Sequence, residues 1–270
     1  MLSPLYGQLS PLRVPTMAGV NAAQIAADYI AAVESADGQP LESAVKTAYQ
    51  NFISGCVSDG LWLALKSSCI LAGARTLSGA LVPLVGTAPT NNNFVTADFN
   101  RKTGLIGNST TKYLNTNRPS NSDPQNNCHI SIYQNATSSG TKTWIGHYQA
   151  TPFVQSDLLT SGGLVYSRLN SSSTGTTTAS ATALGFYGAS RSFAASFSFK
   201  RPNTAETTIT RSSATPSSLN NYVFASNNDG VLSNVHGARL SFFSIGESLN
   251  LTLFNTRVSN LMTALAAAIP

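Results

Sequence analysis

Carboxylates are among the side chains that most often carry out hydrolysis, and this chain holds few of them in useful positions. Its only glutamates are Glu34, Glu42, Glu206 and Glu247. Enzymes that cleave polysaccharides usually place two carboxyl groups across the scissile bond. Glu34 and Glu42 fall in segments predicted to be helical, Glu247 lies just before the last predicted helix, and no strand carries an alternating Glu-x-Asp-x-Glu array. We therefore expect no catalytic carboxylate pair.

The histidines, His129, His147 and His236, also lack the setting that nucleophilic catalysis needs. No serine lies in a Gly-x-Ser-x-Gly sequence, the strained turn that exposes a nucleophile in many hydrolases. His129 and His147 fall in predicted strands, where an imidazole is more often a hydrogen-bonded structural group than a base. The sequence therefore predicts a protein that is not an enzyme and has no catalytic residue.

Metal ligands are not clustered in the sequence. The cysteines, Cys56, Cys69 and Cys128, are odd in number and widely spaced, which suits neither a disulfide framework nor a zinc site. Cys128 begins an alternating apolar run, where a thiol acts as a small buried hydrophobe. Loops at Asp123 and Asp229 have ligands that suit calcium, but Asp-Pro and Asp-Gly are common turn pairs and explain both loops more simply. We expect no metal and no cofactor.

Surface recognition is the chemistry that remains. A β-sandwich that binds sugar normally uses exposed aromatic rings together with Asn, Asp and backbone groups in loops. Tyr113, Trp144, Tyr148 and Tyr187 are the aromatic residues that could contact a glycan. Each could equally lie in the core or at its rim, and the core is the more frequent place for a single aromatic residue.

The composition is typical of a protein that works inside an assembly. Only 10% of the residues are charged, against about 25% in ordinary soluble proteins. The net charge is +5, and no basic run is longer than the pairs Arg101-Lys102 and Lys200-Arg201. Nucleic-acid binding needs a concentrated cationic surface and is not expected. No segment has the 18 or so apolar residues of a membrane span or the pattern of a signal peptide, so we expect assembly in a cytoplasm.

The first part of the chain is predicted to be an extended arm over residues 1–20 followed by a helical piece over residues 21–68. Three prolines fix the arm in an extended conformation, and its apolar content predicts docking onto a neighbouring subunit or onto its own domain. The residues that could anchor it are Leu5, Tyr6, Leu9, Leu12 and Arg13. One helix is expected from the N-cap Asn21 to Asp37-Gly38, and a second after Pro40.

Residues 69–270 are predicted to form a β-sandwich that ends in an amphipathic helix. Short segments rich in strand-forming residues alternate with turns, as in sandwiches; they are 94–99, 111–116, 129–134, 143–148, 163–168, 184–187, 192–199, 207–211, 222–225 and 239–245. The uncharged stretch 170–182 is expected to be a solvated loop, with an exposed edge segment as the alternative. The last helix begins after Ser248 or Asn250 and is expected to cap the sandwich, with pairing to a partner helix as the alternative.

Three segments resemble a group of tailed-phage virion proteins: Asp28–Leu84, Phe99–Tyr133 and Tyr222–Leu265. The third resembles it most, with a strand, an Asn-rich turn, an Arg-Leu-x-Phe-Phe-x-Ile-Gly strand and a closing helix. The resemblance implies a concanavalin-like or laminin-G-like antiparallel β-sandwich, or jelly roll, and a place on the virion surface. It implies no catalytic set and no site residue.

Two functions follow as expectations. The first is a virion structural protein of a tail fibre, baseplate or head appendage that binds host-surface glycan, which for this fold is analogy. The second is a capsid decoration protein that stabilises the head. The expected partners are other virion proteins, further copies of the chain in a homo-oligomer, and host carbohydrate, with no nucleic acid and no membrane.

Overall fold

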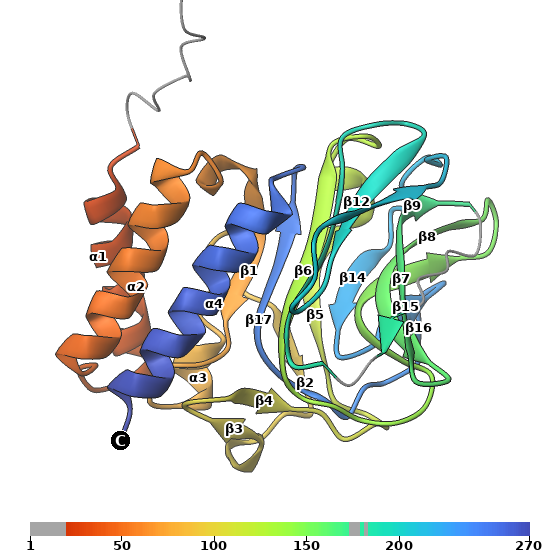
Figure 1. Ribbon diagram of the computed structural model, residues 1–270. Helices are drawn as coiled ribbons and strands as arrows, with labels where there is room; N and C mark the ends of the chain where they lie inside the picture. The colour runs from red at the N-terminus through yellow and green to blue at the C-terminus, as the bar shows by residue number, and fades with distance from the viewer. Residues whose placement is uncertain (1–19, 173–178, 181–182) are drawn as a thin grey trace, which may run out of the picture.

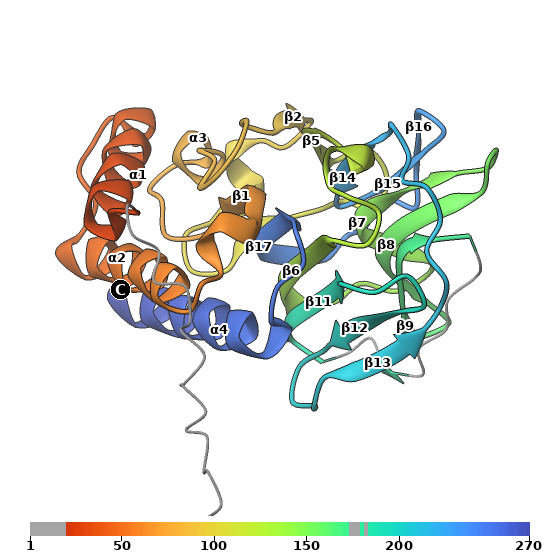
Figure 2. The same cartoon turned by 90° about the horizontal axis from the view of Figure 1, so that it is seen from above.

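The computed structural model describes residues 20–172, 179–180 and 183–270, and it is mainly β (Figure 1). Two sheets stack face to face, and a layer of helices covers the outer face of one of them (Figure 2). The helices are α1 (Ala22–Asp37), α2 (Ser43–Ser58), α3 (Leu77–Ala80) and α4 (Leu251–Ala268). Short 3-10 turns lie at Trp62–Ala64, Thr96–Asp98 and Ser120–Ser122.

The first sheet is antiparallel in every pairing among the described residues. Its spatial order is β13 (Thr207–Thr210), β12 (Ser196–Lys200), β11 (Gly185–Arg191), β6 (Cys128–Ala136), β17 (Arg239–Gly246), β4 (Gly104–Ile106) and β3 (Phe99–Asn100). Strand β1 (Leu65–Ile70) also pairs with β17.

The second sheet is mixed. Its order is β10 (Ala179–Ser180), β9 (Leu164–Ser171), β8 (Val154–Ser161), β7 (Lys142–Gln149), β14 (Asn220–Val223), β5 (Tyr113–Pro119) and β2 (Thr90–Asn92). A hairpin of β15 (Ser226–Asn228) and β16 (Val231–Ser233) joins it through a parallel pairing of β15 with β7.

One hydrophobic core fills the space between the sheets. Ile130 and Ile132 of β6 face Leu158 of β8 across this layer, as alternation along a strand requires. Trp144 stacks on Tyr187 at 4.7 Å between ring centroids, which ties β7 to β11. The β-sandwich expected from the sequence is therefore confirmed.

A second core joins the helices to the outer face of the first sheet. Phe254 of α4 contacts Phe186 of β11 and Phe242 of β17 in edge-to-face geometry, and Phe242 also contacts Phe52 of α2. Helices α1, α2 and α4 lie side by side in one layer, although α4 comes from the opposite end of the chain (Figures 1 and 2). The closing helix caps the sandwich, as expected.

The ends of the helices follow local signals. The Asn21 side chain accepts a hydrogen bond from the Gln24 N–H at 3.1 Å, and Gly38 ends α1 in the left-handed conformation with φ 68°. Asn250 caps α4 in the same way, accepting from the Leu253 N–H at 2.9 Å. Predictions of these helices from the sequence were correct for this reason.

The strand predictions need correction at several places. Strand β1 begins inside the piece predicted to be helical, and strands β2, β4, β8, β15 and β16 were not predicted. Residues 94–99 hold a 3-10 turn in place of the predicted strand. In 192–199 only the second half is a strand, and Phe193 in the preceding turn is 69% exposed.

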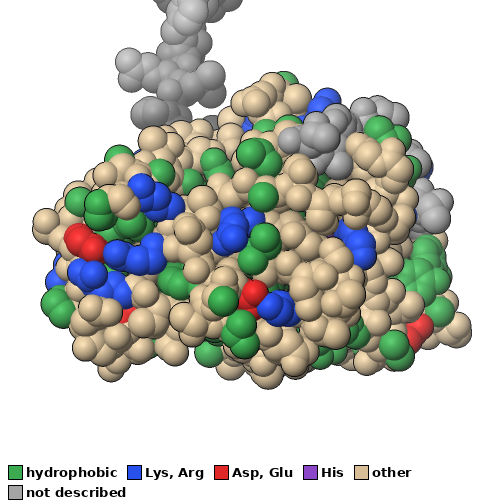
Figure 3. Space-filling view, turned by 90° about the horizontal axis from the view of Figure 1, so that it is seen from below, with side chains coloured by type: hydrophobic (Ala, Val, Ile, Leu, Met, Phe, Trp, Pro, Cys, Tyr) green, Lys and Arg blue, Asp and Glu red, His purple; other side chains and the backbone are tan. Residues whose placement is uncertain are grey.

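The arm residues Leu5, Tyr6, Leu9, Leu12 and Arg13 lie outside the described residues, as does most of the loop predicted at 170–182. None of the helices in the described ranges has both the length and the hydropathy needed to cross a bilayer. On the face seen in Figure 3, charged side chains form one cluster at the left and a few separate spots elsewhere, and the rest of the face is mostly uncharged.

Candidate functional site

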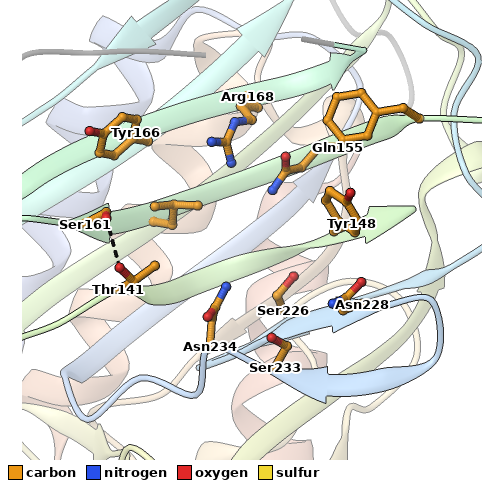
Figure 4. Close-up of a pocket in the computed structure, with 12 residues that line it drawn as sticks. Thr141, Tyr148, Gln155, Ser161, Tyr166, Arg168, Ser226, Asn228, Ser233 and Asn234 are labelled. Atoms are coloured by element: carbon orange, nitrogen blue, oxygen red, sulfur yellow. Dashed lines mark hydrogen bonds between the residues drawn. The ribbon is translucent and has the colours of Figure 1, made fainter. Parts of the chain in front are cut away.

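A groove of about 530 Å³ lies on the outer face of the second sheet, the face that the helices do not cover (Figures 1 and 4). Strands β7, β8 and β9 form its floor, and the β15–β16 hairpin forms one wall. Its volume falls within the range of about 300–1,000 Å³ typical of small-molecule sites. The lining residues are Thr141, Tyr148, Phe153, Gln155, Leu159, Ser161, Tyr166, Arg168, Ser226, Asn228, Ser233 and Asn234.

Strand alternation explains why these side chains point into the groove. In β8, Ser156 and Leu158 face the inside of the sandwich, so Gln155 and Asp157 face outward. Gly146 of β7 lies opposite Asp157 in the strand register. A Cβ atom at Gly146 would lie 2.2 Å from the Ser156 carbonyl oxygen and 2.6 Å from the Asp157 Cβ, so only glycine fits there.

An ion pair occupies the floor of the groove. Asp157 is fully buried, and Arg168 Nη1 donates to its two oxygens at 3.2 and 3.4 Å. Gln155 Nε2 donates to Asp157 Oδ2 at 2.5 Å. Burial raises the pKa of Asp157 to about 6 even though Arg168 and Gln155 oppose the rise. The Arg168 Nε atom is buried and has no hydrogen-bond partner.

Aromatic rings line the groove at two places. Tyr148, the last residue but one of β7, contacts the Phe153 ring edge to face at 5.4 Å between centroids. Tyr166 of β9 lies further along the same face, two residues before Arg168 (Figure 4). All three rings are half-buried, so part of each is accessible from the groove.

Polar side chains of the β15–β16 hairpin and of the residue after it line the groove at the hairpin wall. The side chains of Ser226, Asn228, Ser233 and Asn234 make no hydrogen bond within the described part of the chain. Asp229, at the tip of the hairpin, accepts from the Ala150 N–H at 3.1 Å and so holds the hairpin against the end of β7. The backbone pairing of β15 with β7 and the Asp229 side chain therefore fix the wall, while the four side chains named above are available to a ligand.

Of the four aromatic residues predicted as glycan contacts, only Tyr148 lines the groove. Trp144 and Tyr187 are fully buried and stacked on each other, which corrects the expectation that they contact a glycan: they are core residues. Tyr113 packs against Tyr222 at 4.6 Å between centroids and does not line the groove.

Sequence reasoning missed most of the groove, including Phe153, Gln155, Tyr166 and Arg168. A signal for two of them was present, because Tyr166 and Arg168 alternate with Val165 and Ser167 in a segment that was predicted to be a strand. Two outward residues of these types on one strand indicate a polar, aromatic surface.

The histidines do not contribute to this site. His129 contacts the Glu247 carbonyl oxygen at 2.6 Å and Ser244 Oγ at 2.8 Å. Burial lowers the pKa of His129 and His147 to about 4 and that of His236 to about 3, so all three are neutral at pH 7. They pack and hydrogen-bond inside the protein.

The acidic loops are satisfied by protein groups. Arg118 donates to Asp123 Oδ1 at 2.7 Å and to Oδ2 at 3.2 Å, and Asp229 accepts from Ala150 as described. Among the described residues there is no group of three or more His, Cys, Asp or Glu side chains that could hold a metal ion. The three cysteines are buried thiols, and burial raises the pKa of Cys56 and Cys128 to about 12.

The fold and the site together define a β-sandwich whose second sheet carries a groove lined by aromatic rings, by uncharged polar side chains and by an arginine that pairs with a buried aspartate. No protein-family model matches the sequence, and no curated protein is detectably similar to it.

Proposed function

We propose that this chain is a non-enzymatic structural protein of a tailed-phage particle, carried on its surface in a tail fibre, baseplate or head appendage, and that it binds host-surface glycan in the groove. The virion assignment is supported by the sequence resemblance and the low charge content. We further propose that the sandwich is a concanavalin-like jelly roll, a fold that often binds carbohydrate.

The observation that carries the glycan proposal is the combination of side chains in the groove. A sugar ring presents apolar C–H faces and a rim of hydroxyl groups that both donate and accept hydrogen bonds. Tyr148, Phe153 and Tyr166 offer ring faces, while Asn228 and Asn234 offer amides that have no partner in the described protein. Apolar surface with a few unpaired polar groups is the usual composition of a specific binding site.

Binding without cleavage is supported by the position of the carboxylates. Glycosidases usually need two carboxyl groups about 5–9.5 Å apart at the bond to be cleaved. Asp157, the carboxylate at the floor, is fully buried beneath Gln155 and Arg168. None of the described residues that line the groove is Asp or Glu.

Tyr148→Ala and Tyr166→Ala should each weaken glycan binding about tenfold, or about 1.4 kcal/mol, because each removes an aromatic ring from the lining of the groove. The measurement is surface plasmon resonance of the full chain over a panel of immobilised bacterial capsular polysaccharides and lipopolysaccharide O-chains. Tyr113→Ala is the matched control, since Tyr113 is a half-buried tyrosine outside the groove. Absence of binding by the unmodified protein at millimolar sugar would refute the glycan proposal.

The second candidate, a capsid decoration protein, is favoured by the low charge content and the apolar segment at residues 1–20. Immunogold labelling of particles, with antibodies raised against the purified chain, separates the two roles. We expect gold at the tail, the baseplate or discrete appendages. Uniform labelling of the head shell would favour decoration, and particles without label would contradict a virion role.

A further inference from the structure

We infer that the groove selects uncharged sugars over acidic ones, because Asp157 neutralises the only cationic side chain among the described residues that line it. This inference rests on the proposed function, in that it names the class of glycan for the same site. The side chains that determine this preference lie at the floor of the groove. Gln155 and Arg168 (Figure 4) both donate hydrogen bonds to the Asp157 carboxylate.

The strand register fixes the ion pair. Asp157 of β8 and Arg168 of β9 are direct cross-strand partners, so their side chains leave the sheet side by side on the same face. Arg168 Nη1 lies within 3.4 Å of both carboxylate oxygens, and the Arg168 side chain is only 12% exposed. At this burial the charge of one group is screened little by water. A ligand therefore meets the pair as a neutral unit.

Gln155 adds a hydrogen-bond acceptor to this floor. Its Nε2 donates to Asp157, which turns its Oε1 atom away from the ion pair. A sugar hydroxyl can donate to that oxygen, whereas a sugar carboxylate would bring an acceptor against an acceptor. A sugar carboxylate placed in the groove would also lose its hydrating water, and it would gain no unpaired cationic side chain among the described lining residues in return.

Among the described residues that line the groove, Arg168 is the one charged side chain. Gly146, on the neighbouring strand β7, faces Asp157 without a side chain. The hairpin residues that line the groove are Ser and Asn, and Asp229 at the hairpin tip is bonded to the Ala150 N–H. The tyrosines Tyr148 and Tyr166 complete the titratable groups of the lining. Protonation or removal of the Asp157 charge is then the one change that leaves Arg168 available to an anion.

The test compares matched sugars on the full-length chain. The probes are glucose, galactose and mannose homopolymers with free C6 hydroxymethyl groups, the same polymers oxidised at C6 to uronates, and natural neutral and acidic capsular polysaccharides. At pH 7.5 we expect the unmodified protein to bind the neutral member of a pair at least tenfold more tightly. Asp157→Asn should raise affinity for the acidic member about tenfold or more, since it leaves a net positive charge beside the ligand.

Asp28→Asn is the matched control, because Asp28 is an exposed carboxylate on α1 that hydrogen-bonds Gln24, and it should leave the preference unchanged. The unmodified protein at pH 5 gives the same test without a substitution. The pKa of Asp157 is about 6, so this group is largely protonated there, and uronates, with pKa values near about 3.5, stay charged. Affinity for acidic members should rise relative to pH 7.5.

Three outcomes are decisive. Equal or tighter binding of acidic members at pH 7.5 overturns this inference and leaves glycan binding intact. An acidic affinity that rises neither in Asp157→Asn nor at pH 5 shows that Asp157 does not set the preference, and also overturns it. Failure of the unmodified protein to bind any neutral or acidic sugar refutes the proposed function itself.

Discussion

Replacement of Arg191 by methionine is expected to lower the free energy of unfolding by about 3–5 kcal/mol, because it leaves several buried carbonyl groups without a donor. Arg191 is fully buried at the end of β11 and has no carboxylate partner among the described residues. It donates instead to Ser171 Oγ and to the backbone oxygens of Leu169, Phe193, Ala194, Ser196 and Arg211.

These bonds join strand β9 to the turn before β12 and to the residue after β13. Methionine fills similar space but donates nothing, so the carbonyl groups stay desolvated and unpaired. Burial of its charge lowers the pKa of Arg191, which means that the charge is held in the core at a cost. Removing this buried charge therefore offsets part of the lost stability. The bonds from Arg191 hold the turn before β12 in a conformation that leaves the Phe193 side chain exposed, although phenylalanine is usually buried.

Urea unfolding followed by tryptophan fluorescence measures this effect, since Trp144 lies in the core between the sheets. Arg201→Met is the matched control. The Arg201 side chain makes no hydrogen bond within the described residues, and its loss should change stability by less than about 0.5 kcal/mol. A loss below about 1 kcal/mol in Arg191→Met would mean that the carbonyl groups find other donors.

Arg168→Met is expected to destabilise the protein by about 3–5 kcal/mol at pH 8 and by much less at pH 5, because it leaves the buried Asp157 charge unpaired. Burial raises the pKa of Asp157 from 3.8 to about 6 in the folded protein. The folded state therefore holds this proton more tightly than the unfolded state, and the contribution of Asp157 to stability falls as pH rises through about 4 to 7.

Without Arg168 the pKa of Asp157 rises further, so the fall in stability becomes steeper and continues to higher pH. At pH 5 Asp157 is mostly protonated in both the unmodified protein and Arg168→Met, so the difference between their free energies of unfolding becomes smaller. Urea unfolding at pH 5 and pH 8 measures both values. The double variant Asp157→Asn with Arg168→Met should recover most of the loss at pH 8. An equal loss at both pH values would assign the effect to packing of the arginine and not to its charge.

The helices could be predicted because their signals are local. Asn21, Gly38 and Asn250 cap helices through bonds that span three residues or fewer, so the sequence alone carries them. Strands β1 and β8 were missed because they bury polar residues. Ser67 and Ser68 of β1 are buried, and the Ser68 hydroxyl donates to the Phe243 carbonyl oxygen far along the chain. Asp157 of β8 is buried and pairs with Arg168 on the neighbouring strand β9. Such partners are invisible to a local pattern.

The groove was harder to predict for a geometric reason. In a regular strand Trp144 and Tyr148 would face the same side of the sheet, so alternation alone would place both rings in the core or both at the surface. The register shifts between Thr143 and Ile145, which is a β-bulge. Trp144 and Ile145 consequently both enter the core, while Tyr148 reaches the groove. A single extra residue decides which ring meets a ligand.

The arrangement of the helical layer gives the molecule a direction. Residue 20 leads directly into α1, which lies in the helical layer, and the groove opens on the sheet at the other side of the sandwich (Figure 1). Under the proposed attachment to a particle through the amino-terminal segment, the helical layer would lie next to the particle and the groove would face away from it. The helices would then separate the second sheet from the attachment surface.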